Sequence, residues 1–91
     1  MKFICPTIGE DDERDFLVTG NLEDFRIIVF SDIDEFKSGI DYLEVVGYQP
    51  TEVSIKLFKE LSKNDDEFKG IRLNPHNENL FISKKEILDK F

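Results

Sequence analysis

Residues 26–30 constrain the fold more than any other part of the chain. They read Arg-Ile-Ile-Val-Phe, an apolar run rich in β-branched residues after its first position. Consecutive apolar residues over such a short stretch are typical of a strand that is buried on both faces. We therefore expect residues 26–30 to form the central strand of a sheet, with other elements covering it.

The size and composition of the chain predict one domain with a modest core. The 91 residues suffice for one domain and are too few for two. Hydrophobic residues make up 40% of them, including nine Phe, so a core can form without a disulfide or a metal. Cys5 is the only cysteine, which excludes an intramolecular disulfide and predicts a small buried hydrophobic side chain.

The chain lacks the sequence features of membrane insertion. No apolar stretch approaches the roughly 18 residues of a membrane span. The N-terminus also lacks the apolar region of a signal peptide. We expect a soluble, cytoplasmic protein with no membrane contact.

Short apolar runs between turn-forming residues predict further strands. Pro6 cannot donate a backbone hydrogen bond, so we expect it at the end of the first strand or on a sheet edge. The last two strands flank an Asn-Pro-His-Asn-Glu turn and should form a hairpin. The expected strands are residues 3–5, 16–18, 42–46, 70–73 and 79–82.

Capping signals and periodicity predict about three helices. Ser31 and Asp34 resemble a capping box, so a short helix should begin there and end before Gly39. The longest helix should follow a loop at residues 47–50 and end near residue 64. Its expected buried stripe is Val53, Leu57 and Leu61.

Ser83 and Glu86 form the S-x-x-E capping box of a last helix. Strands and helices alternate only partly along the chain, and hairpin-like pairs remain. We therefore expect an α+β fold: a single domain with a mixed, mostly short-stranded sheet and about three helices.

The net charge of −8 is concentrated in the first half of the chain. Residues 1–44 hold twelve acidic and four basic residues, whereas residues 45–91 hold eight of each. This balance disfavours nucleic acid, whose phosphates require Lys and Arg, and favours a protein partner with a basic surface. A solvated loop is the alternative interpretation of residues 10–15. The candidate partner-binding residues are Glu10, Asp11, Asp12, Glu13, Asp15, Glu23 and Asp24.

Catalytic, metal and cofactor sites are not predicted. Asp32 and Asp34 follow the central strand as Asp-x-Asp, a pair that serves haloacid-dehalogenase-type phosphatases as nucleophile and acid/base. The further Lys, Ser/Thr and acidic groups of that site have little room here, so we interpret the pair as helix-start acids. His76 lies among Asn residues that make a poor zinc site, and we expect an exposed turn histidine.

Two short motifs resemble the N-terminal domain of the SseB family. The first is the strand end at Phe30, Ser31, Asp32 and Phe36, and the second contains Gly70, Ile71, Asn74, Pro75 and Leu80. The resemblance covers nearly all of residues 1–91 and implies a mixed α/β domain. It carries no biochemical activity that can be transferred to this chain. The motif residues also have structural interpretations: Ser31 as a cap, Phe30 and Phe36 in packing, and Asn74-Pro75 in a turn.

Taken together, these features favour a non-enzymatic interaction or regulatory module that binds a protein partner through its acidic N-terminal surface. One alternative is a small acidic inhibitor or immunity-type protein that blocks a basic enzyme surface. Another is an enzyme that uses Asp32 and Asp34.

Overall fold

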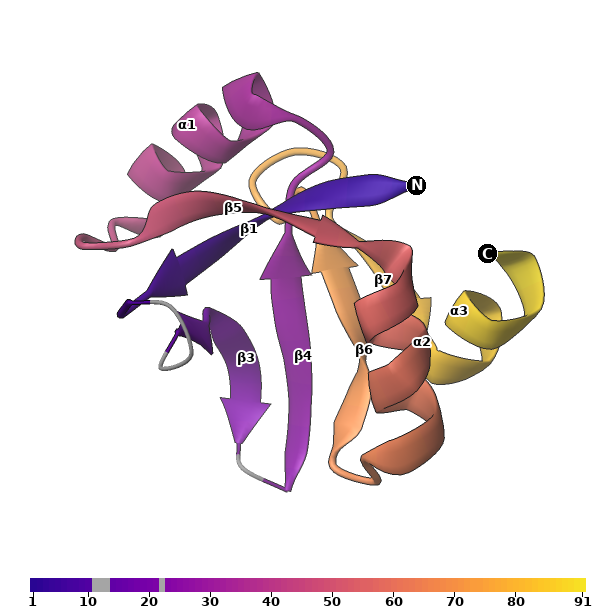
Figure 1. Ribbon diagram of the computed structural model, residues 1–91. Coiled ribbons are helices and arrows are strands. Elements are labelled where there is room, and N and C mark those ends of the chain that lie inside the picture. The colour runs from indigo at the N-terminus through magenta and orange to yellow at the C-terminus, as the bar shows by residue number, and fades with distance from the viewer. Residues whose placement is uncertain (11–13, 22) are drawn as a thin grey trace.

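The computed structural model describes residues 1–10, 14–21 and 23–91 (Figure 1). Strands and helices both contribute to it, and the predicted α+β class is confirmed. The strands are β1 (Lys2–Ile8), β2 (Asp15–Phe16), β3 (Val18–Asn21), β4 (Asp24–Val29), β5 (Gln49–Ser54), β6 (Phe68–Leu73) and β7 (Leu80–Ser83), and the helices are α1 (Ile33–Leu43), α2 (Ile55–Asn64) and α3 (Lys84–Lys90).

The described strands form two sheets. A four-stranded sheet has the order β3-β4-β6-β7, in which β4 and β6 are parallel and the other pairs antiparallel. The second sheet, β2-β1-β5, is antiparallel. An isolated bridge joins them, because Ile4 and Phe30 exchange two backbone hydrogen bonds of 2.8 Å. The prediction that residues 26–30 form a central strand is confirmed by β4, which lies between β3 and β6.

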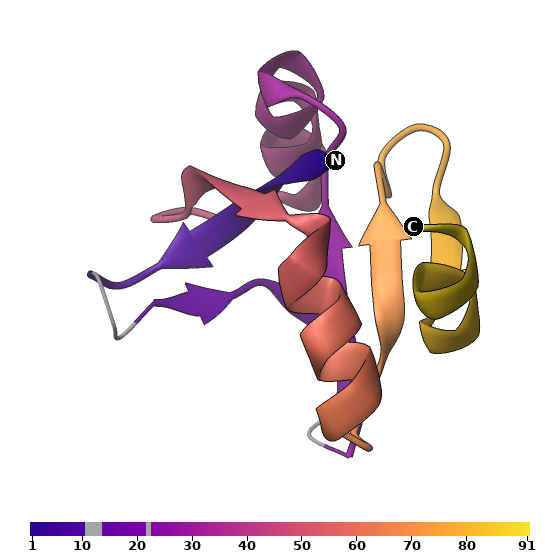
Figure 2. The ribbon, with the colours of Figure 1, turned by 45° about the vertical axis from the view of Figure 1, so that its right-hand side comes forward.

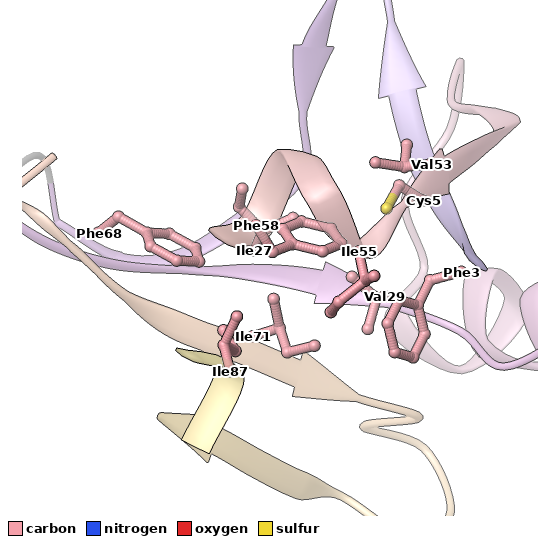
Figure 3. Packing of buried hydrophobic residues seen from close by; sticks show 10 residues of the cluster. All are labelled: Phe3, Cys5, Ile27, Val29, Val53, Ile55, Phe58, Phe68, Ile71 and Ile87. Carbon is pink, nitrogen blue, oxygen red and sulfur yellow. The ribbon is translucent and has the colours of Figure 1, made fainter. Parts of the chain in front are cut away.

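The main core fills the space between β4, β6 and the helices α2 and α3 (Figures 2 and 3). Phe58 of α2 stacks on Phe68 of β6 at 6.5 Å between ring centroids and meets the edge of Phe3 at 6.0 Å. Cys5 is fully buried in this cluster, as predicted. A buried Phe contributes about 1.5 to 3 kcal/mol, so the three rings stabilise the fold substantially.

A smaller core lies on the opposite face of β4. Ile28 and Phe30 alternate along the strand with the main-core residues Ile27 and Val29, so they point the other way. Phe36 of α1 packs there in an edge-to-face contact with Phe30, at 5.9 Å between ring centroids. Helix α1 therefore covers one end of the sheet face that α2 and α3 leave free.

The expectation for Pro6 is wrong, because β1 continues through it and occupies the middle of its sheet. Pro6 pairs with Pro50 of β5, but its backbone polar groups face away from β5, and the Leu17 carbonyl opposite accepts the N–H of Ile28 at 2.9 Å, so no acceptor there depends on an N–H of Pro6. On the other side, the carbonyl of Pro6 accepts the N–H of Leu17 at 3.1 Å. The pairing of two prolines is visible only once the strands are aligned.

The expectations for residues 31–46 are also partly wrong. The N-cap of α1 is Asp32, whose side chain accepts the N–H of Glu35 at 2.8 Å, and not Ser31. Gly39 does not stop this helix but lies buried inside it. The helix ends at Glu44 in a left-handed conformation, so residues 42–46 form no strand.

Helix α2 is shorter than expected, and a different set of its residues faces the core. It begins after its cap Ser54, and Val53 belongs to strand β5. Ile55, Phe58 and Ser62 face the core, whereas Leu57 is 36% exposed. The hairpin of β6 and β7 and the Ser83–Glu86 capping box of α3 are confirmed.

Candidate functional site

An apolar groove of about 610 Å³ lies beside helix α2, over the inner face of β3 and β4. It exists because α2 and α3 pack mainly on β6 and β7 and leave the β3 side of the sheet uncovered (Figure 1). The apolar part of its lining comes from β2, β3, β4 and α2 and consists of Phe16, Val18, Gly20, Phe25, Ile27, Leu57 and Leu61. The polar residues of the lining are Asp15, Asn21 and Glu67.

Gly20 helps to keep the groove open. Its backbone has φ +102, and a side chain there would collide with the carbonyl of Asp24. Glycine is the residue that adopts this conformation readily. The turn from β3 into β4 can therefore stay tight, and no side chain at residue 20 enters the groove.

Several large hydrophobic side chains at the groove are unusually accessible. Val18 is 45% and Leu57 36% exposed, while Phe16, Phe25 and Leu61 are partly buried against the main core. Single exposed apolar residues are ordinary, but a contiguous set in a concave place marks binding surfaces. The groove is thus suited to apolar side chains of a ligand or partner.

The acidic residues predicted for partner binding have different relations to this groove. Asp15 lines it directly. Glu23 and Asp24 are exposed in the turn next to Asn21, and Asp24 lies 3.5 Å from Arg26 in an ion pair. Glu10 is exposed before β2. The predicted residues Asp11, Asp12 and Glu13 lie outside the described residues.

Glu67 belongs to the groove but was not predicted, because it lies in the neutral half of the sequence. Its carbonyl accepts the backbone N–H of Phe25 at 3.0 Å, where β4 and β6 begin side by side. Only the parallel pairing of these strands places Glu67 in the groove lining. No local signal in residues 64–68 indicates it.

The two motifs of the family resemblance meet at the carboxyl ends of the parallel strands β4 and β6. The side-chain carbonyl of Asn74, which is fully buried, accepts the N–H of Ser31 at 3.2 Å, and its amide donates to the Ser31 hydroxyl at 3.2 Å. The same amide donates to Glu78 at 3.0 Å. The motif residues therefore join two strand ends, and Pro75 continues from there into the turn.

His76 is not the exposed turn residue that the sequence predicts. Its side chain is 9% exposed, with Nε2 2.8 Å from a carboxylate oxygen of Glu35. Its ring lies against Phe30, at 5.6 Å between centroids. His76 thus fastens the β6–β7 turn to helix α1.

Asp32 and Asp34 have positions that agree with helix-start acids. Asp32 caps α1, and Asp34 is an exposed residue of the first turn. Within residues 1–10, 14–21 and 23–91, no group of three His, Cys, Asp or Glu side chains is placed to hold a metal ion. Burial raises the pKa of Cys5 to about 12, so its thiol stays protonated and poorly nucleophilic at neutral pH.

No helix of the described chain is long and apolar enough to cross a membrane. No protein-family model, curated protein or solved structure matches the sequence. The resemblance to the SseB family stays a prediction.

Proposed function

We propose that this chain is a non-enzymatic, SseB-like interaction module that binds a basic, apolar segment of a partner protein in the groove beside α2. The observation that carries the proposal is an apolar groove with the carboxylates of Asp15 and Glu67 in its lining, in a chain with a net charge of −8. A reducing compartment such as the cytoplasm fits a chain whose single thiol is buried.

The apolar lining would supply most of the binding free energy. Burying apolar surface contributes about 25 cal/mol per Å² removed from water. Val18 and Leu57 have exposed apolar surface that a partner can cover, whereas Ile27 is already buried. A partner that covers both accessible side chains therefore gains hydrophobic contacts without rearranging the core.

The carboxylates would select the charge of the partner. Asp15 and Glu67 lie in the lining, and Glu23 and Asp24 are exposed in the neighbouring turn. Like charges repel nucleic acid, while Lys and Arg side chains gain both attraction and faster association. Because exposed charges are screened by salt, affinity should fall as ionic strength rises.

The edge strand β3 favours an extended occupant. All four of its residues are exposed, and among the strands that the structure describes it pairs only with β4 in its sheet. An edge strand has free backbone groups, to which an extended peptide can add as a further strand. Alternate side chains of that strand would point toward the groove, so apolar residues should recur at every second position of the partner segment, with Lys or Arg at its ends to reach the carboxylates.

Peptides of defined sequence test the proposal. We expect an extended peptide with Val at every second position, Ser between them and Arg at both ends to shift backbone amide NMR signals of residues 18–21, 57 and 61 in the ¹⁵N-labelled chain. The same peptide with Glu in place of Arg should not bind. If both peptides bind equally, or if the shifts lie elsewhere, the groove is not the binding site.

A matched pair of variants separates binding from stability. Leu57→Asp places a charge in the groove, and Leu88→Asp places one on α3, where Leu88 is 40% exposed and outside the groove lining. Only the first should abolish peptide binding. Equal loss in both variants would show that the substitutions act by destabilising the fold and not at the groove, which contradicts the proposed site.

A further inference from the structure

Arg26, Arg72 and Phe81 come together on the face of the four-stranded sheet opposite α2 and α3. The guanidinium carbons of Arg26 and Arg72 lie 4.8 Å and 5.4 Å from the centroid of the Phe81 ring. Arg72 pairs with Phe81 across β6 and β7, and with Ile28 across β6 and β4. Three neighbouring strands therefore supply one cluster, which we call the arginine platform (Arg26, Arg72 and Phe81).

Gly70 makes this arrangement possible. It pairs with Arg26 on β4 and with Ser83 on β7, so it lies between the strands that carry the outer two residues of the platform. A Cβ at Gly70 would come within 2.9 Å of the Phe81 ring and would overlap the carbonyl of Ile82. Without that atom, the ring can lie over β6 and reach Arg26.

The platform is open to solvent and has an excess of positive charge. Phe81 is 38% exposed, and the smaller core under α1 occupies only the end of this face at Ile28 and Phe30. Arg26 has one acidic neighbour, Asp24 at 3.5 Å, while its Nε is buried and has no hydrogen-bond acceptor among the described residues. Among the described residues, no acidic side chain forms an ion pair with Arg72 within 4.0 Å.

Two like charges near one ring are unfavourable unless an anion compensates them. Only three arginines occur in the chain, and two of them lie here although acids outnumber bases by eight. Stacking on Phe81 offsets part of the repulsion, since each cation–π contact contributes about 0.5 to 1 kcal/mol at an exposed site. An anion shared by both guanidinium groups would offset the rest.

We infer that the arginine platform is a binding site for a phosphate monoester. A phosphate group carries about −1.5 to −2 charges at neutral pH and has three strong acceptor oxygens. It can accept hydrogen bonds from two guanidinium groups at once, and the planar fork of Arg matches its geometry. The phosphate can belong to a small molecule or to a phosphorylated side chain of a protein. The site lies on another face of the sheet than the groove and does not depend on the groove.

NMR titration of the intact ¹⁵N-labelled chain with O-phosphoserine tests the inference, with serine as the control that lacks only the phosphate. We expect shifts of the amide signals of residues 70, 72 and 81 and of the Nε–H signals of Arg26 and Arg72. Residues 57 and 61 of the groove should not shift. Absence of saturable shifts with both O-phosphoserine and a phosphoserine peptide would overturn the inference.

Variants then assign the effect to the two arginines. Arg72→Gln should weaken binding about tenfold or more, because it removes a charge-assisted hydrogen bond to the phosphate. Arg14→Gln, at an exposed arginine outside the platform, should leave binding unchanged. Arg72→Lys keeps the charge but loses the planar fork, and it should bind more weakly than the unaltered chain at an unchanged melting temperature. Equal weakening by Arg14→Gln and Arg72→Gln would reduce the effect to net charge and refute the site.

The two sources of phosphate differ in their outcome. If O-phosphoserine and a phosphoserine peptide bind with similar affinity, the platform recognises the phosphate group of a small molecule. If the peptide binds at least about tenfold more tightly, a phosphorylated protein segment is the better ligand. Either result supports the site.

Discussion

The side chain of Asn74 holds Ser31 by two hydrogen bonds, although 43 positions separate the residues in sequence. Its carbonyl accepts the Ser31 N–H at 3.2 Å, and its amide donates to the Ser31 hydroxyl at 3.2 Å. Its backbone N–H also donates to the carbonyl of Val29 at 3.0 Å. One buried residue thus fixes the point where β4 leaves the sheet and the chain turns toward α1.

We expect Asn74→Ala to lower the free energy of unfolding by about 1 to 3 kcal/mol or more. The substitution removes the three side-chain hydrogen bonds of a fully buried residue, and the loss of such bonds costs about that much. Asn74 also has φ +46, which Asn tolerates better than Ala. Urea denaturation followed by circular dichroism measures the change.

Ser31→Ala is the matched control, because it removes only the hydroxyl partner of the Asn74 amide. Ser31 is exposed, so its substitution should cost less than about 1 kcal/mol. A cost for Asn74→Ala no larger than that of Ser31→Ala would contradict the role assigned to Asn74.

The junction at Asn74 illustrates what the sequence can predict. The hairpin turn at Asn74 and Pro75 is a local signal, and so is the apolar run of β4. The ends of β4 and β6 meet because the two strands pair in parallel, and no local sequence pattern specifies this pairing. For the same reason the sequence places His76 in a turn but not against Glu35.

Strand β5 and the groove show a second limit of prediction from the sequence. The residues of β5 read Gln-Pro-Thr-Glu-Val-Ser, which is too polar to indicate a strand. Its partner β1 stabilises it through paired backbone groups from Lys2 to Thr7. The acidity of the first half of the chain predicts Asp15 as a candidate partner-binding residue but no groove, and Glu67 joins the groove lining only through tertiary structure.

Gly39 provides a test in which packing opposes helix propensity. It lies inside α1, where Ala would ordinarily be more favourable by about 1 kcal/mol. A Cβ at this position would overlap the ring of Phe30 and lie 3.1 Å from Nδ1 of His76. We therefore expect Gly39→Ala to destabilise the protein by about 1 to 3 kcal/mol through overpacking.

Thermal unfolding of Gly39→Ala and Ser38→Ala measures this effect. Ser38 is exposed in the same helix and should show only the small gain of helix propensity. An increase of stability in Gly39→Ala would mean that α1 can move away from Phe30 at little cost.

Phe58 and Leu57 are neighbours in α2 with opposite environments. Phe58 is fully buried between Phe3 and Phe68, while Leu57 is 36% exposed at the groove. Phe58→Ala should cost about 3 to 5 kcal/mol, because it removes a large ring and leaves a cavity. Leu57→Ala should cost less than about 1 kcal/mol. Chemical denaturation of both variants compares them, and similar costs would mean that Leu57 is as enclosed as Phe58, which contradicts the orientation of α2.

Because the thiol of Cys5 is buried, we expect the free energy of unfolding to fall at high pH. Burial raises its pKa from 9.0 to about 12. Between these values the folded chain keeps the thiol proton and the unfolded chain loses it, so the free energy of unfolding decreases as pH rises above about 9. The slope from this group reaches about 1.4 kcal/mol per pH unit. Below pH 9 the stabilisation is complete.

Cys5→Ala isolates this contribution, because Lys and Tyr groups titrate in both proteins. We expect Cys5→Ala to be less stable at pH 8 and the difference to narrow between pH 9 and pH 11, as measured by urea denaturation. Folded protein at pH 8 should also react with a thiol reagent far more slowly than protein unfolded in urea. Parallel stability curves for the two proteins, or fast labelling of the folded chain, would show that the thiol is accessible to water and not held in the core beside Val53.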